Sequence, residues 1–148
     1  MKTKAQRMML MFGLLLALAA LPVQAQNGSR LVVHVPFDFQ VNDELFVAGT
    51  YAFEQTAGSS VVAIRKTDGR RSAKILTNST SPVAPEEMRA SIVFNHYADQ
   101  FFLAAIYDGS GAGRRFRQSA NERSFVRELA ESGAESKPQR VEVAVLSK

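Results

Sequence analysis

The sequence of 148 residues contains no cysteine, no tryptophan and only two histidines. Without cysteine, the chain cannot form a disulfide, bind a metal through thiolates, use a cysteine nucleophile or carry a lipid on an N-terminal cysteine. Its apolar run at residues 8–21 is 14 residues long, whereas a helix needs about 20 to span a bilayer. The composition, 46% hydrophobic and 22% charged, is typical of one ordinary globular domain.

Residues 1–25 are typical of a cleaved secretory signal peptide. Three basic residues precede the apolar run, and the small-residue sequence Val23-Gln24-Ala25 follows Pro22. A membrane anchor is the alternative, but the apolar run is short for that role. We therefore expect cleavage after Ala25, contact with the membrane only during transit, and a periplasmic or extracellular location.

Removal of residues 1–25 also changes the charge. It takes away three basic and no acidic side chains, so the net charge falls from +4 to +1, with 15 basic against 14 acidic residues. The high isoelectric point is therefore largely a property of the export signal. We expect no nucleic acid as a partner.

Alternation of apolar and polar residues predicts a mainly β domain over residues 31–132. Residues 31–41 alternate, and Pro36 favours an edge strand or a bend there. Asp68-Gly69 predicts a hairpin turn, and residues 91–97 and 101–107 predict a second hairpin whose continuous apolar content indicates burial on both faces. We expect a small antiparallel sandwich or partly open barrel of about seven or eight strands, with most of the nine phenylalanines of the mature chain in its core.

The remaining segments are interpreted from their local signals. Residues 26–30 are expected to be flexible, residues 78–85 a surface loop, and the glycine-rich residues 109–113 a connector. Ser119 and Glu122 form a capping-box pattern that predicts one short helix near 120–132. Residues 133–148 are interpreted as a linker with a possible last strand at 141–145.

Several motifs together resemble those of a group of small exported bacterial proteins of unknown function. The motifs, which cover nearly the whole mature chain, are Val33-His34-Val35-Pro36-Phe37-Asp38-Phe39, Ala48-Gly49-Thr50-Tyr51, Asp68-Gly69, Val93-Phe94-Asn95-His96-Tyr97, Phe101-Phe102-Leu103 and Ser119 to Glu122. The chain departs from the group at residues 46–49, which read Phe-Val-Ala-Gly where Leu-Pro-Ala-Gly is usual. The resemblance implies export and a β-rich domain and assigns no site.

Motifs for catalysis or for a cofactor are lacking. The candidate metal pairs are His34 with Asp38 and His96 with Asp99, but residues 34 and 38 of one extended strand lie about 13 Å apart, too far for one ion unless the chain bends. No nucleophile elbow or glycine-rich nucleotide loop occurs. We therefore expect no catalytic residue, no metal and no cofactor. An unrecognised hydrolase assembled from distant strands is an alternative.

Basic residues gather in two stretches of the sequence. They are Arg65, Lys66, Arg70, Arg71 and Lys74 around the Asp-Gly turn, and Arg114, Arg115 and Arg117 before the predicted helix. If the two stretches meet in space, they form a patch for phosphate or carboxylate groups. The alternative is a solvated charged face.

These observations favour an exported, non-enzymatic structural or interaction module. Its expected partner is another envelope protein or an anionic envelope polymer. The alternative function is a β-barrel carrier of a small apolar ligand. Polyanion binding should weaken with salt, whereas apolar binding should depend little on it.

Overall fold

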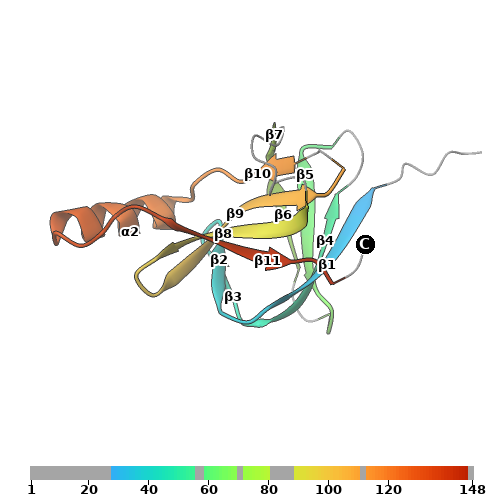
Figure 1. Cartoon of the computed structure of the whole chain (residues 1–148), viewed down its shortest axis with the longest axis horizontal. Coiled ribbons are helices and arrows are strands. Elements are labelled where there is room, and N and C mark those ends of the chain that lie inside the picture. The colour runs from blue at the N-terminus through green and yellow to red at the C-terminus, as the bar shows by residue number, and fades with distance from the viewer. Residues whose placement is uncertain (1–27, 56–58, 70–71, 81–88, 111–112, 147–148) are drawn as a thin grey trace, which may run out of the picture.

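The computed structural model describes residues 28–55, 59–69, 72–80, 89–110 and 113–146 (Figure 1). The expected signal peptide lies outside these residues, as do Arg70 and Arg71. The elements are β1 (Ser29–Val35), β2 (Phe39–Val41), β3 (Glu44–Phe46), β4 (Gly49–Gln55), β5 (Val61–Lys66), β6 (Ser72–Leu76), β7 (Asn78–Thr80), β8 (Ala90–Tyr97), β9 (Gln100–Asp108), β10 (Gly113–Arg115), α2 (Ala120–Glu131) and β11 (Gln139–Ala144). No helix in the described ranges is long and apolar enough to cross a membrane.

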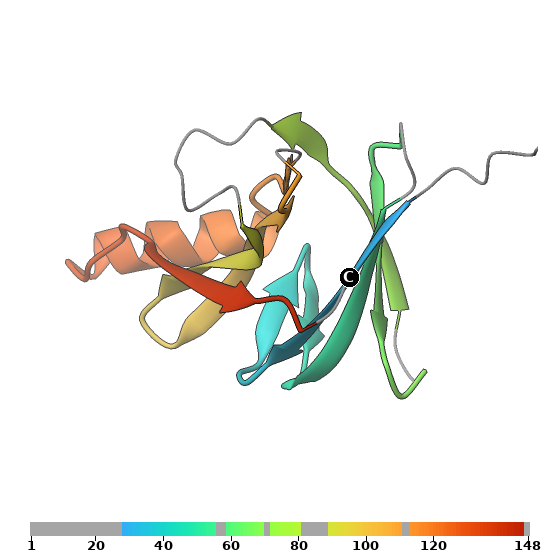
Figure 2. The same cartoon turned by 45° about the vertical axis from the view of Figure 1, so that its right-hand side comes forward.

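The strands form two curled sheets that together make a half-barrel. The smaller sheet has the order β1-β4-β5-β6, and the larger has the order β11-β8-β9-β10-β7, with β2 and β3 attached beside β9. The chain passes from β6 through Thr77 into β7 and so from one sheet to the other (Figure 2). On the other side, the Leu146 amide donates to the Val32 carbonyl at 2.7 Å. The predicted fold class, a small sandwich or partly open barrel with one C-terminal helix, is confirmed.

The core lies between the two sheets and is built from the inward side chains of alternating strands. Its centre is a cluster of aromatic rings, in which Phe39 contacts Tyr51 and Phe94, each with ring centroids 5.2 Å apart. Each such ring contributes about 1.5–3 kcal/mol when fully buried. Five phenylalanines are buried, namely Phe39, Phe46, Phe53, Phe94 and Phe102, and the other four of the mature chain are partly buried. The prediction that most phenylalanines lie in the core is confirmed for these five.

The alternating segment at residues 31–41 bends at Pro36, as its sequence predicted. β1 ends at Val35 in the smaller sheet, and β2 begins at Phe39 in the larger one. Pro36 cannot donate to a strand ladder, so pairing stops there. Asp38 holds the bend, because its Oδ1 accepts from the Ala48 amide at 2.7 Å.

Two short strands were missed by the sequence-based prediction. Asn78–Thr80, expected in a loop, is β7, and Gly113–Arg115, which includes the end of the expected connector, is β10. β7 and β10 pair with each other, and β10 also pairs with β9. Three residues are too few to show a period of two, and their pairing depends on distant segments. Within the described residues, four such three-residue strands raise the count to eleven, above the expected seven or eight.

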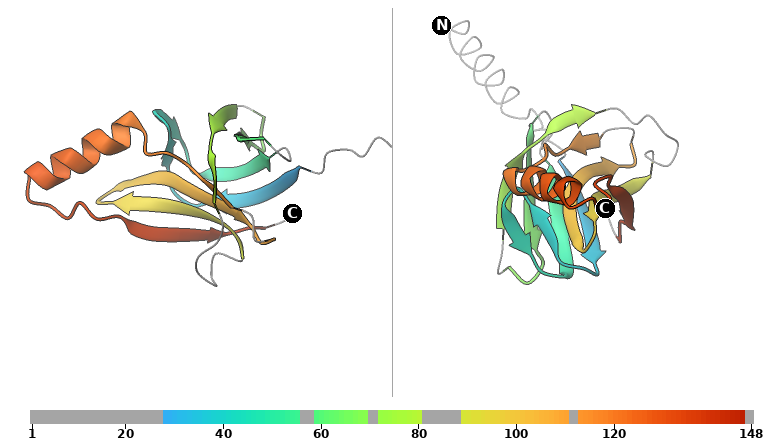
Figure 3. Two further views of the ribbon diagram at one scale, coloured as in Figure 1. Left: turned by 90° about the horizontal axis from the view of Figure 1, so that it is seen from above. Right: turned by 90° about the vertical axis from the view of Figure 1, so that its left-hand side faces the viewer.

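Helix α2 begins and ends close to the predicted positions. Its N-cap is Ser119, whose Oγ accepts from the Glu122 amide at 3.0 Å. The predicted reciprocal half of the capping box is wrong, because the Glu122 carboxylate turns to β8 instead. Figure 3 shows α2 running beside the tip of the β8–β9 hairpin, where the rings of Phe102 and Phe125 lie 6.2 Å apart.

The predicted last strand is confirmed as β11. It pairs antiparallel with β8, so that Val141 lies opposite Phe94 and Val143 opposite Ile92. The valines of β11 pack against the core cluster. The C-terminal segment is thus an edge strand of the larger sheet.

Candidate functional site: an arginine-flanked pocket on the larger sheet

The larger sheet has an outer face, formed by the side chains that point away from the core. Cross-strand register defines it: Val93 of β8 lies opposite Ala105 of β9, Ala105 lies opposite Arg115 of β10, and Asn95 of β8 lies opposite Arg140 of β11. Because paired residues share a face, these side chains from four strands lie together.

A β-bulge in β9 hollows this face. Val93 pairs with Ala105 and Phe94 pairs with Leu103, so Ala104 is the extra residue in the ladder. A bulge bends its strand and increases the local twist. Ala104 and Ala105 also carry the smallest side chains, which leaves a depression between the larger groups on neighbouring strands.

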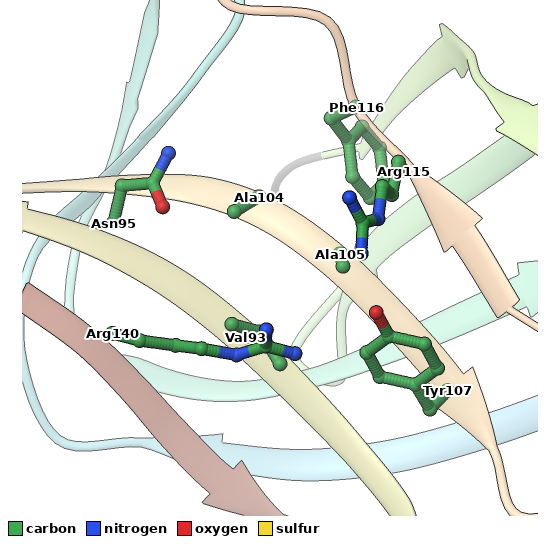
Figure 4. A pocket seen from close by; sticks show the side chains of 8 residues that line it. All are labelled: Val93, Asn95, Ala104, Ala105, Tyr107, Arg115, Phe116 and Arg140. Carbon is green, nitrogen blue, oxygen red and sulfur yellow. The ribbon is translucent and has the colours of Figure 1, made fainter. Parts of the chain in front are cut away.

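The depression is a pocket of about 230 Å³, which we call the Arg115–Arg140 pocket (Figure 4). Its polar lining residues are Asn95, Tyr107, Arg115 and Arg140, and its apolar lining residues are Val93, Ala104, Ala105 and Phe116. Figure 4 shows Arg140 reaching in from β11 and Arg115 from β10. Two guanidinium groups from separate strands therefore border one small volume.

Tyr107 forms part of the pocket wall and is fully buried, with 0% of its surface exposed. Its hydroxyl finds no hydrogen-bond partner among the described residues, and Figure 4 shows it pointing toward Arg115. The Arg140 guanidinium carbon lies 5.9 Å from the centre of the Tyr107 ring. A buried hydroxyl without a partner lowers the stability of the folded state by about 1–3 kcal/mol. An acceptor placed in the pocket would remove this cost.

A buried polar cluster adjoins the pocket at Asn95. The Glu122 carboxylate accepts from Asn95 Nδ2 at 3.0 Å and from the Tyr97 hydroxyl at 3.1 Å. Glu122 is 3% exposed. Burial, the Glu122 charge and the hydrogen bond to Glu122 raise the pKa of Tyr97 from 10.0 to about 12. Tyr97 thus remains a neutral donor, and Glu122 fixes the orientation of the Asn95 amide at the pocket wall.

Comparisons with protein-family models, with curated proteins and with solved structures find no match for this chain. The resemblance to exported bacterial proteins stays a prediction.

The basic residues singled out in the sequence are spread over both sheets. Arg65 and Lys74 are exposed on the outward side of β5 and β6 in the smaller sheet. Lys66 Nζ lies 3.7 Å from Asp68 Oδ2. Arg115 lines the pocket of the larger sheet, and Arg117 borders a separate hollow with Leu76.

Arg114 has a structural environment of its own between the sheets. It donates to Ser79 Oγ on β7. With the Gln55 amide oxygen turned toward it, Arg114 Nε and Nη2 also lie 2.9 and 3.0 Å from that oxygen. Arg114 thus connects the end of β4 to β7, and the eight-residue basic patch as a whole stays a prediction.

Three polar residues of the pocket were missed by reasoning from the sequence: Asn95, Tyr107 and Arg140. A signal exists for Arg140, which alternates with the valines of β11. Asn95 interrupts the apolar run of β8. These patterns do not predict that β11 lies beside β8. The pocket depends on this long-range pairing.

Three of the four residues considered for a metal, His34, Asp38 and His96, have other contacts. His34 Nδ1 lies 3.2 Å from Thr50 Oγ1, and Asp38 binds the Ala48 amide. The His96 ring stacks on Phe101 with centroids 4.2 Å apart. In the part of the chain that the structure describes, no group of three or more histidine, aspartate or glutamate side chains is placed to hold a metal ion.

Proposed function

We propose that this protein is an exported, non-enzymatic interaction module that binds an anionic group of an envelope protein or polymer in the Arg115–Arg140 pocket. The observation that carries the proposal is the approach of two guanidinium groups, from β10 and β11, to one concave site. Guanidinium groups keep their charge at any physiological pH and bind carboxylate or phosphate through paired donors. The charged residues of the lining are the two arginines, which attract anions, and the Glu142 carboxylate lies beside them on the same face, opposite Val93.

The chemistry of the lining favours binding over turnover. The described lining residues offer hydrogen-bond donors and apolar walls, but they include no serine, histidine or carboxylate to serve as nucleophile or base. The expected apolar-carrier alternative requires room between the sheets, where contacting aromatic rings lie instead. Neither alternative gains support from a specific observation.

Export rests on the features of residues 1–25. N-terminal sequencing of the protein recovered from the periplasm or the medium should begin at Gln26-Asn27-Gly28. A protein that keeps its first 25 residues and stays with the cytoplasmic fraction would contradict this part of the proposal.

Binding is tested by NMR titration of the purified protein with polygalacturonate, a carboxylate polymer, against neutral dextran. We expect amide shifts along β8, β9, β10 and β11 that weaken steeply between about 50 and 200 mM salt, because counterions are released on binding. Arg140→Gln should weaken binding about tenfold or more, since hydrogen bonds to charged groups contribute about 1.5–3 kcal/mol. Arg65→Gln, an exposed arginine of the smaller sheet, is the matched control. Equal losses in the two variants would count against the pocket.

A further inference from the structure

We infer that the Arg115–Arg140 pocket takes a single carboxylate carried on a compact apolar body, with the Tyr107 hydroxyl donating to the carboxylate. This inference rests on the proposed function, because it names the kind of anionic group that enters the same site. Three features of the pocket lead to it: an unpartnered hydroxyl, the charge around that hydroxyl, and the volume and chemistry of the walls.

The hydroxyl of Tyr107 is the first feature. The side chain is fully buried, and in the described structure no hydrogen-bond partner reaches its oxygen. A phenylalanine would fill the same space without the cost of an unsatisfied polar atom. A ligand oxygen in the pocket gives this hydroxyl the acceptor that it lacks.

The two positive charges of the lining favour an anionic acceptor, with Glu142 as a carboxylate beside them, opposite Val93 on the same face. Arg115 and Arg140 border the pocket from two sides (Figure 4), and both groups are donors without acceptor capacity. A carboxylate has two oxygens with about four acceptor sites. It can therefore accept from an arginine and from the Tyr107 hydroxyl at the same time.

The size and the walls of the pocket determine what carries the carboxylate. Its volume is about 230 Å³, compared with about 150 Å³ for a cavity that binds benzene and about 300–1,000 Å³ for sites of drug-sized ligands. Val93, Ala104 and Phe116 supply apolar wall. A benzoate-sized group fits these limits. Inorganic phosphate would leave the apolar wall uncovered, and a polymer could insert only one end or side group.

The same chemistry occurs in a free aromatic acid and in the C-terminal residue of a peptide, so the test includes both. The purified protein is titrated by calorimetry and NMR with benzoate, with benzyl alcohol as the neutral counterpart, and with inorganic phosphate. An acetylated peptide ending in phenylalanine and its C-terminal amide form the second arm. We expect benzoate to bind at least tenfold more tightly than benzyl alcohol or phosphate. If the free-acid peptide binds and its amide does not, the C-terminal carboxylate of a peptide is also a ligand of the pocket. If benzoate binds and neither peptide does, the pocket takes free aromatic acids.

Tyr107→Phe is the decisive variant, because it removes one oxygen and keeps the ring. We expect benzoate affinity to fall about tenfold, while the variant without ligand is as stable as the parent protein or more stable. Tyr51→Phe is the matched control: Tyr51 is an equally buried tyrosine whose hydroxyl donates to the Val47 carbonyl, and its loss should leave benzoate affinity unchanged.

Unchanged benzoate binding in Tyr107→Phe, or equal affinities for phosphate and benzoate, would overturn the inference. The proposed function would survive that result if polygalacturonate still bound with dependence on Arg140. Failure of benzoate, phosphate and polygalacturonate alike would overturn both.

Discussion

The outer faces of the two sheets of the half-barrel differ in solvent exposure. On the smaller sheet, outward residues such as Arg65 and Lys74 are exposed to solvent. On the larger sheet, outward residues such as Val93, Ala105 and Tyr107 are at most 4% exposed. The smaller sheet therefore has one buried face, whereas the β8–β9 hairpin is buried on both, as its continuous apolar content predicted. Burial of a polar group is costly, so Tyr107 and Glu122, which are buried against this outer face, call for an explanation, whereas Arg115 and Arg140 beside them are exposed.

The largest expected effect comes from the face that both sheets share, the core. Phe94→Ala removes a ring that contacts Phe39 at 5.2 Å and Phe37 at 5.2 Å. Truncation of a buried phenylalanine typically costs about 3–5 kcal/mol. We expect a loss of unfolding free energy of about that size in urea denaturation, against less than about 0.5 kcal/mol for Lys74→Ala on the solvated face. Similar losses in the two variants would remove the distinction between the faces.

The buried carboxylate on the outer face of the larger sheet should come next. In Glu122→Gln, the amide oxygen can still accept from Asn95 and Tyr97, which both donate to Oε1, but the two hydrogen bonds lose the charge of the carboxylate that strengthens them. We expect a loss of about 1–3 kcal/mol, measured by urea denaturation. Glu128→Gln, on the exposed side of the same helix, should change stability by less than about 0.5 kcal/mol. A neutral result for Glu122→Gln would mean that the cluster does not hold α2 to β8.

Tyr97 gives this cluster a pH dependence of known sign. Its pKa is raised from 10.0 to about 12 in the folded protein, so the folded state holds the phenol proton more tightly than the unfolded state does. The resulting stabilisation is complete below pH 10, and it is lost as the pH rises through the folded pKa of about 12. Absorbance at about 295 nm, the phenolate band, should therefore show a phenol that titrates later than an ordinary tyrosine.

Two variants check that assignment. Tyr97→Phe should remove the late-titrating phenol. Glu122→Gln should lower the pKa of Tyr97, because the Glu122 charge and hydrogen bond both raise it. If the phenol lost in Tyr97→Phe titrates near the ordinary value of about 10, that result would contradict the buried position of Tyr97.

The features of the two faces also differ in whether neighbouring residues or distant segments determine them, and therefore in whether the sequence predicts them. The Asp68-Gly69 turn, the Ser119 cap and the continuous apolar content of β8 are local patterns, and each was predicted from a few neighbouring residues. The pocket was not predicted, because Arg140 lies beside Asn95 only through the pairing of β11 with β8. The alternation of residues within a strand does not reveal which strands are neighbours in a sheet. Glu122 shows the same limit. Its spacing from Ser119 predicted that its carboxylate would cap the helix, but the carboxylate accepts from Asn95 and Tyr97 of β8 instead.

The smallest expected effect lies on the outer face of the smaller sheet. Arg30 Nε and Glu54 Oε1 are 3.6 Å apart across β1 and β4, with side chains 63% and 39% exposed. Water and salt screen such a pair, and holding two long side chains in one geometry costs entropy. Arg30→Ala should therefore lower the unfolding free energy by about 0–0.5 kcal/mol in urea denaturation. A loss as large as that of Glu122→Gln would show that the smaller sheet also depends on its outward charges, and the two faces would then differ in exposure alone.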